Sequence, residues 1–187
     1  MANATQITTG KVRFSYLNVF QARAINDGDQ PKFSVTLLIP KSDKATVTKI
    51  KATMEAAKTS YMQRNSGKKL PANLKHTMHD GDGERPNGGE FGEECAGHYV
   101  MTVSSKNAPV LVYADKTPIT EPKELFSGCY GRAIINFYVY DTNGNKGISA
   151  GLNGLMKLYD GAPLGGGVVT DSDWDDDWED DADDLLD

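Results

Sequence analysis

The chain has 187 residues, with 26 Asp and Glu against 20 Lys and Arg, a formal net charge of −6 and only two cysteines, Cys95 and Cys129. No apolar run approaches the roughly 18 residues that a membrane-spanning helix needs, and the first residues lack the basic and then apolar segments of a secretory signal. Two cysteines do not make a disulfide framework. We therefore expect a cytoplasmic protein with a reduced interior and no membrane contact.

Alternating apolar residues predict two strands near the start of the chain. In residues 10–20 the apolar face includes Tyr16, and Arg13 lies on the opposite face. Residues 32–39 repeat this alternation, with Thr36 facing outward. Both strands should therefore present a polar, partly cationic outer surface.

A helix is predicted over residues 43–64, with Ser42 as its N-cap. Its apolar stripe consists of Val47, Ile50, Met54, Ala57 and Tyr61. Residues 67–97 follow as a long polar stretch that contains too many glycines and prolines for regular elements. A connection of this length inside a compact domain is usually functional or mobile.

Further strands are predicted in the second half. Residues 98–104 alternate, residues 109–113 form a short strand that looks buried, and residues 129–140 form the longest strand. The apolar face of the longest strand is made by Ala133, Ile135, Phe137 and Val139. Asn143-Gly144 predicts a tight hairpin turn, and the glycines of the return strand indicate bends or bulges.

These elements predict a mostly β fold. Five or six strands, one substantial helix and a long loop, without a parallel β-α-β rhythm, favour a Greek-key barrel of the oligonucleotide/oligosaccharide-binding (OB) type with the helix inserted. The expected boundaries are a flexible leader over residues 1–9, the OB domain over 10–166 and a disordered acidic tail over 167–187.

Residues 170–187 hold eleven acids and no Lys or Arg, so the rest of the chain carries a net charge of +5. Eleven like charges predict disorder in isolation, whereas exposed Trp and Leu are typical of a docking peptide rather than of a solubilising tail. The residues assigned to partner docking are Asp171, Asp173, Trp174, Asp175, Asp176, Asp177, Trp178, Glu179, Asp180, Asp181, Asp183, Asp184, Leu185, Leu186 and Asp187.

Cations and tyrosines on strands and in the long loop predict a surface for single-stranded nucleic acid, where Lys and Arg hold phosphates and rings stack on bases. The candidate DNA-binding residues are Arg13, Lys32, Lys68, Lys69, Lys75, Arg85, Tyr130, Arg132, Tyr138 and Tyr140. The alternatives are that the tyrosines pack beneath the helix or the loop, and that the loop cations are merely solvated. A polyanionic tail resembles nucleic acid and would compete for the same surface.

Other chemistry has weaker support. His76, His79, Cys95 and His98 resemble a zinc ligand set, but one Cys with three His is uncommon, so no metal is assigned. The HDGDGE stretch at residues 79–84 suggests a metal-dependent nuclease, yet no second carboxylate cluster supports it. The sequence contains no P-loop and no supported catalytic triad. We therefore expect no enzymatic activity and no cofactor.

Three stretches resemble the single-stranded DNA-binding proteins of tailed bacteriophages: KVRFSYLNVF at residues 11–20, HDGDGERP at 79–86, and SGCYGRAIINFYVYDTNGNKGISAGLNGLMKLYDGAPLGG at 127–166. The resemblance implies an OB barrel that coats single strands during phage replication, recombination and repair in the infected host. It also implies an acidic tail that restrains binding and recruits phage or host replication proteins. The family's tails typically end in an aromatic residue, whereas this one ends Leu-Leu-Asp.

Two other functions remain open at this stage. One is a structural or DNA-mimicking phage protein whose body has no affinity for DNA, and the other is a metal-dependent nuclease. The sequence leaves open the oligomeric state, with a homodimer among the options, and the preference between DNA and RNA.

Overall fold

The computed structural model describes residues 4–24, 26–142 and 144–164, so the predicted docking residues of the acidic tail lie outside it. None of the described helices is long and apolar enough to cross a membrane. In chain order the elements are β1 (Gln6–Thr8), β2 (Val12–Arg23), β3 (Lys32–Pro40), α1 (Lys44–Arg64), β4 (Met78–Asp80), the 3-10 helix η1 (Glu93–Cys95), β5 (His98–Ser105), β6 (Val110–Tyr113), the 3-10 helix η2 (Pro122–Glu124), β7 (Tyr130–Thr142) and β8 (Asn145–Tyr159).

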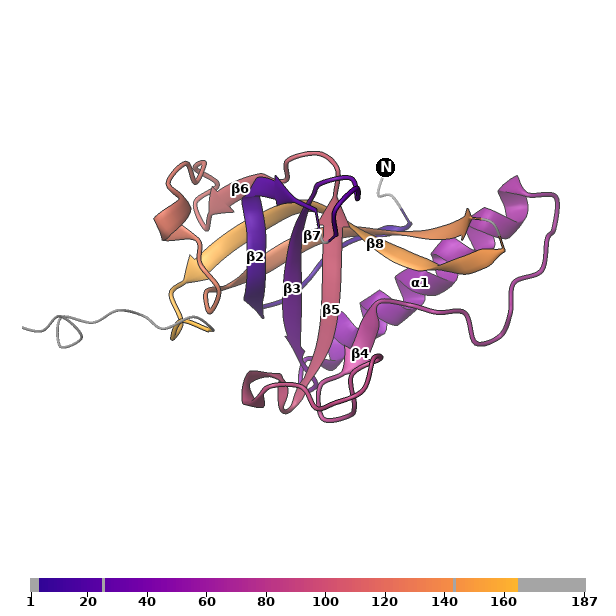
Figure 1. Cartoon of the computed structure of the whole chain (residues 1–187), viewed down its shortest axis with the longest axis horizontal. Coiled ribbons are helices and arrows are strands. Elements are labelled where there is room, and N and C mark those ends of the chain that lie inside the picture. Colours follow the sequence, from indigo (N-terminus) through magenta and orange to yellow (C-terminus); the bar gives the residue numbers. More distant parts are fainter. Residues whose placement is uncertain (1–3, 25, 143, 165–187) are drawn as a thin grey trace, which may run out of the picture.

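Five strands close into a barrel. β2, β3 and β5 lie side by side, and the long β7–β8 hairpin crosses them (Figure 1). β5 meets β8 in parallel through Ser104 and Gly151, and β7 returns to β2 through Tyr130 and Gly131. This closed order is that of a five-stranded OB barrel, and it confirms the predicted fold class. The three-residue strands β1 and β4, which the sequence did not indicate, add to β7 and β5.

Alternate side chains fill the barrel, as a period of two along each strand requires. Phe14, Leu37 and Met101 point inward from β2, β3 and β5 and are fully buried. The apolar face predicted for the longest strand is confirmed, since Ile135 and Phe137 of β7 are buried in the same cluster.

The prediction for Tyr16 is wrong. Its backbone has a φ of 48°, and the pairing of β2 with β3 shifts register between Ser15 and Asn18. A bulge of this kind turns the following side chain to the other face of the strand. As a result Tyr16 is 64% exposed instead of lying in the core, and Ser15 is buried.

The outer face of β3 also differs from the prediction. Thr36, expected to be exposed, is buried, and so is Leu38 on the same face. The reason is the stretch before β5, where Cys95 and Phe91 pack against Leu38 and Val100 in a second apolar cluster. The long loop therefore folds back over the barrel.

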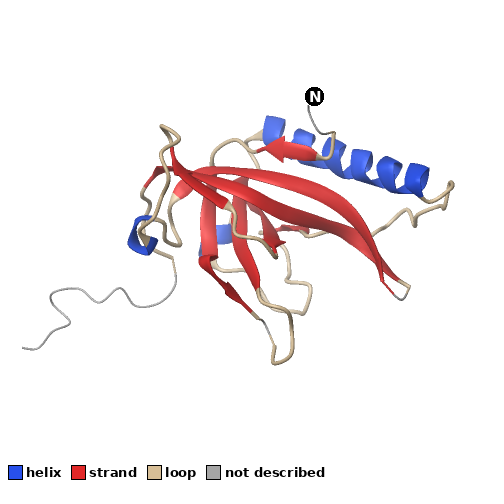
Figure 2. Ribbon diagram, turned by 90° about the horizontal axis from the view of Figure 1, so that it is seen from above, coloured by secondary structure: helices blue, strands red, loops and turns tan. Residues whose placement is uncertain are grey.

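Helix α1 confirms the predicted apolar stripe, which is buried along its length. Its N-cap is Asp43 rather than Ser42, because the Asp43 carboxylate accepts the backbone N–H of Thr46 at 3.1 Å. The helix lies along the β7–β8 hairpin (Figure 2), where the Tyr61 hydroxyl donates to Asp141 at 2.8 Å. Helix and hairpin together form an arm that extends from the barrel.

The predicted hairpin is confirmed by the pairing of Thr142 with Asn145 across a turn in which Gly144 has a φ of 81°. Asn143 itself lies outside the described residues. The glycine-rich return strand carries a bulge at Asn153, as the sequence indicated. β6 differs from the expectation of a buried strand, since Val110 at its start is 65% exposed.

Candidate nucleic-acid interface

One row of side chains runs across the outward-facing side of the barrel sheet, where its middle members, Leu38 and Val100, are buried against Cys95, Phe91 and Leu164. Residues paired across neighbouring strands point to the same side of a sheet, so the observed registers connect the outer positions of β8, β7, β2, β3, β5 and β4 into a single line. The row contains Tyr159, Tyr130, Arg13, Leu38, Val100 and His79, in that order.

The first part of the row is aromatic and cationic. The rings of Tyr130 and Tyr159 lie 5.2 Å apart. The Lys11 ammonium lies 5.8 and 5.5 Å from the centres of these two rings, and the Arg13 guanidinium lies 5.3 Å from that of Tyr130. Interaction with Tyr159, and more weakly with Tyr130, raises the pKa of Lys11. This end of the row is therefore cationic at neutral pH, with rings beside the charges.

Farther along, a groove of about 300 Å³ opens over the outer face of β3 and β5. Thr36 and Thr102 lie on its floor, with their hydroxyls 3.2 Å apart. Tyr16 and Phe91 line its sides, and the Arg85 guanidinium lies 5.5 Å from the centre of the Phe91 ring. Rings and a guanidinium around a polar floor suit the stacking of a base next to a phosphate.

Two ion pairs of Lys41 anchor the loop that carries Arg85 and Phe91. The Lys41 ammonium lies 2.5 Å from the Asp80 carboxylate and 2.6 Å from that of Asp82, which also accepts the N–H of Gly97 at 3.0 Å. Hydrogen bonding to Lys41 lowers the pKa of both carboxyl groups. The acidic pair that suggested a nuclease thus holds a lysine and fixes one side of the groove.

The four residues that resembled a zinc set are dispersed. The rings of His76 and His79 are stacked 6.4 Å apart, whereas Cys95 is buried and His98 Nδ1 lies 2.8 Å from the Ala96 carbonyl oxygen. Within residues 4–24, 26–142 and 144–164, no group of three or more His, Cys, Asp or Glu side chains is placed to hold a metal ion.

The end of the described chain crosses this surface. After β8, the Ala162 carbonyl accepts a hydrogen bond of 2.6 Å from Arg13. The Leu164 N–H donates to the Ser127 carbonyl at 2.9 Å, and the Leu164 side chain packs against the cluster around Leu38. The described part of the chain therefore ends beside the groove, at Leu164.

Of the predicted DNA-binding residues, the structure brings Arg13 and Tyr130 into the row and Arg85 to the groove. The sequence analysis missed Lys11, Tyr16, Phe91, His79 and Tyr159. Only Tyr159 gave a usable signal, because it ends the strand that the hairpin turn pairs with β7.

The remaining candidates lie elsewhere. Lys32 lies at the start of β3 beside Arg23 and Lys106, and the exposed Lys68 and Lys69 follow α1. The backbone of Lys75 pairs with that of Gly147, near the start of β8. On the outer face of the arm, Tyr138 is 43% exposed and Tyr140 covers Gly147. Arg132 donates from Nε to the Thr9 carbonyl at 2.9 Å.

A closed OB barrel with a cationic and aromatic row on its outer surface defines a protein of the single-strand-binding class. The family described as "Enterobacter phage Enc34, ssDNA-binding protein" matches residues 5–186, and the chain belongs to this family. The chain is also 28% identical over 188 residues to "Putative protein p50" of Acyrthosiphon pisum secondary endosymbiont phage 1, covering 97% of this chain and 98% of that protein.

Solved structures agree with this assignment. The single-stranded DNA-binding protein from bacteriophage Enc34 in complex with ssDNA has a TM-score of 0.73 at 26% identity, covering 87% of this chain and 91% of that one. A C-terminal truncation of the same Enc34 protein gives a TM-score of 0.70 over 87% and 90% of the two chains at 26% identity. Bacteriophage T7 gp2.5, at 16% identity and a TM-score of 0.58 over 94% and 96%, shares the fold. The family and these solved relatives are binding proteins and not enzymes, which confirms the prediction for this chain.

Proposed function

We propose that this protein binds single-stranded DNA without strong sequence preference and acts in phage DNA replication, recombination and repair in the cytoplasm of an infected cell. The observation that carries the proposal is the continuous outer row, in which Lys11, Arg13 and Tyr130 lead into a groove lined by Tyr16 and Phe91. The Enc34 relative whose structure was solved in complex with ssDNA supports the choice of ligand.

The row suggests how a strand would be held. Lys11, Arg13 and Arg85 would neutralise successive phosphates, and the rings of Tyr16, Phe91 and Tyr130 would stack on bases. Stacking uses the face that every base shares, so this arrangement tolerates any sequence.

The acidic tail would compete with DNA for this surface and bind replication and recombination proteins of the phage or its host. Support for competition comes from the path of the chain, because Ala162 is bonded to Arg13 and Leu164 packs beside the groove. The described chain therefore ends close to Arg13, one of the cations that a strand would need. The apolar tail side chains Trp174, Trp178, Leu185 and Leu186 would serve as anchors for a partner.

The test is a fluorescence-anisotropy titration of labelled oligo-dT across a salt series, with the full-length protein and a truncation ending at Val169. We expect both to bind, with an affinity that falls steeply as salt rises because counterions are released. The truncation should bind more tightly, and the difference should shrink at high salt, where the tail is screened. Equal or weaker binding by the truncation at matched salt would remove the competition.

Failure of both proteins to bind would overturn the proposal in favour of a DNA mimic or structural protein. A gel assay of the same oligonucleotide with magnesium addresses the nuclease alternative. We expect an intact strand, and cleavage that is lost in Asp80→Asn would contradict the proposal. RNA oligomers titrated in parallel determine the preference between the two nucleic acids.

A further inference from the structure

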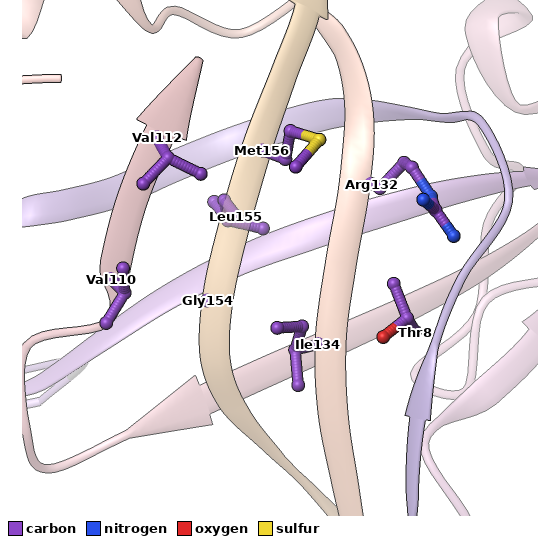
Figure 3. Close-up of a pocket in the computed structure, with 8 residues that line it drawn as sticks. All are labelled: Thr8, Val110, Val112, Arg132, Ile134, Gly154, Leu155 and Met156. Carbon is purple, nitrogen blue, oxygen red and sulfur yellow. The ribbon is translucent and has the colours of Figure 1, made fainter. Parts of the chain in front are cut away.

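A second surface feature lies on the outer face of the β7–β8 sheet. Gly154 of β8 has no side chain, and it leaves a shallow cavity of about 90 Å³ between β6 and β7 (Figure 3). Val110 and Val112 line it on the β6 side, and Ile134 of β7 lines the other. Arg132 and Thr8 lie beyond Ile134, at the edge nearest β1. The walls are almost entirely apolar, with one guanidinium at the rim.

This cavity differs from the proposed DNA surface in the kind of side chain that it exposes. The exposed large apolar residues of the described chain are Tyr16, Val110, Ile134, Tyr138 and Tyr159. Only Val110 and Ile134 are aliphatic, and both border the cavity, where they are 65% and 38% exposed. Aliphatic branches offer no ring on which a base can stack, so this site suits an apolar protein side chain.

The acidic tail of the same chain meets the chemical requirements of an occupant. It places Trp174 and Trp178 among aspartates. An indole would enter an apolar cavity while its acidic neighbours meet the Arg132 guanidinium, which its bond to the Thr9 carbonyl holds at the rim. Apolar cavities of about 150 Å³ accept a benzene ring. This smaller one would take the edge of an indole, and the rest of the ring would lie over Val110 and Ile134.

The length and starting point of the tail also fit. Trp174 lies ten positions after Leu164, which corresponds to roughly 33 Å when extended. Leu164 packs against Leu38, which pairs with Arg13, and Arg13 pairs with Tyr130. The path to Ile134 therefore crosses two strand spacings, roughly 10 Å, and then follows four residues of β7, roughly 13 Å, which is within the extended length. A tail that follows this path passes Lys11 and Arg13 before it reaches the cavity.

We propose that the aromatic part of the acidic tail, Trp174 or Trp178, docks in the cavity at Gly154 and lays the neighbouring aspartates along Lys11, Arg13 and Arg132. The inference extends the proposed competition between tail and DNA by naming where the tail is anchored. Docking itself requires no DNA, so it can be tested separately from DNA binding.

The test uses the full-length protein, because Trp174 and Trp178 are its only two tryptophans. Without DNA, we expect tryptophan emission to be blue-shifted and protected from acrylamide relative to a peptide of residues 171–187. Val110→Glu removes an apolar wall and adds a repelling charge, so it should abolish both the shift and the protection. Gln21→Glu is the matched control, since it adds the same charge at an exposed position of β2 outside the cavity and should leave both unchanged.

A second variant guards against a folding defect in the first. Gly154→Ala places a methyl group in the cavity, where the nearest atoms are the Val110 carbonyl oxygen at 3.2 Å, Val110 Cβ at 3.7 Å and Ile134 Cδ1 at 3.8 Å, and it should reduce the protection. Peptide-like emission from the unaltered protein would overturn the proposal. So would a blue shift that survives both substitutions but disappears with oligo-dT, because the tail would then lie in the DNA groove. A shift that depends on protein concentration would assign the cavity to a second copy. Loss of oligo-dT binding in the Val169 truncation would count against the proposed function and leave docking unaffected.

Discussion

The two ends of the outer face of β7 present different chemistry. At Tyr130 the neighbouring strand is β2, which contributes Arg13, and β8 contributes a second tyrosine. Four residues farther on, the neighbours of Ile134 are Thr8 of β1 and Gly154 of β8. The strand itself simply alternates, so its partners decide whether a position becomes part of a cationic, aromatic row or of an apolar cavity.

The same difference separates the proposed ligands. The row offers charges and rings, which suit a phosphate backbone with bases, whereas the cavity offers aliphatic walls, which suit a protein side chain. Both surfaces belong to one closed sheet over one core. Substitutions should therefore affect the two surfaces together when they reach the core and separately when they do not.

The largest expected effect comes from the shared core. Phe14→Ala removes a fully buried ring and should lower the free energy of unfolding by about 3–5 kcal/mol, with loss of both surfaces. The measurement is urea denaturation followed by circular dichroism. Tyr16→Ala, at an exposed ring two residues away, should change stability by about 0.5 kcal/mol or less. Similar costs for the two variants would contradict the bulge that separates these side chains.

Next in size is the loss of a stacking ring from the groove. Phe91→Ala should weaken oligo-dT binding by about 1–3 kcal/mol, or roughly 5- to 150-fold, as measured by anisotropy. In the truncation ending at Val169, Phe91→Ala should cause the same loss, whereas Val110→Ala, at the cavity, should leave the affinity unchanged because no tail remains to dock. Equal losses would remove the distinction between the surfaces. Tyr138→Ala measures whether the hairpin arm, a predicted DNA-binding region, extends the interface.

A smaller effect distinguishes two arginines. Arg85→Gln should reduce the slope of log affinity against log salt by about 1, as expected for one lost phosphate contact. Arg132→Gln should change this slope less in a tail-truncated protein, because Arg132 is bonded to the Thr9 carbonyl beside the apolar cavity. Equal reductions would place Arg132 in the DNA interface, as the sequence analysis predicted.

The smallest expected effect is a pH dependence at His79, which lines the groove. Burial, and then the neighbouring His76, lower its pKa. The unfolded chain therefore takes up a proton first, and stability falls as the pH drops through the unfolded value of about 6.5. A bound phosphate backbone favours the charged ring, so oligo-dT binding to the truncated protein should strengthen below that pH. His79→Gln should flatten this part of the profile, and an unchanged profile would exclude His79 from the interface.

Much of the fold could be predicted because local signals agreed with the final contacts. Asn143-Gly144 indicated the hairpin, the stripe from Val47 to Tyr61 indicated the buried face of α1, and alternation indicated the inward face of β7. The N-cap was misplaced by one residue, because Ser42 and Asp43 are both suitable capping residues.

The candidate site could be predicted only in part. Arg13 and Tyr130 followed from alternation, but their proximity depends on a register between strands far apart in sequence. Alternation places Tyr16 in the core, whereas a bulge turns it to the outer face. Phe91 could not be predicted because it lies in a loop without periodicity. Non-local pairing and irregular backbone leave little trace in a single sequence.

The pairing of β2 with β7 has a consequence for the order in which the parts of the proposed DNA surface form. The hydrogen bond from Arg13 to the Gly128 carbonyl joins residues separated by 115 positions, and Tyr130 begins the strand that follows. Contacts this distant form only after a large loop has closed. A chain still emerging from the ribosome therefore lacks the aromatic end of the row until β7 and β8, which carry Tyr130 and Tyr159, have been synthesised. The surface proposed to hold DNA is completed late, shortly before translation reaches the acidic tail that would regulate it.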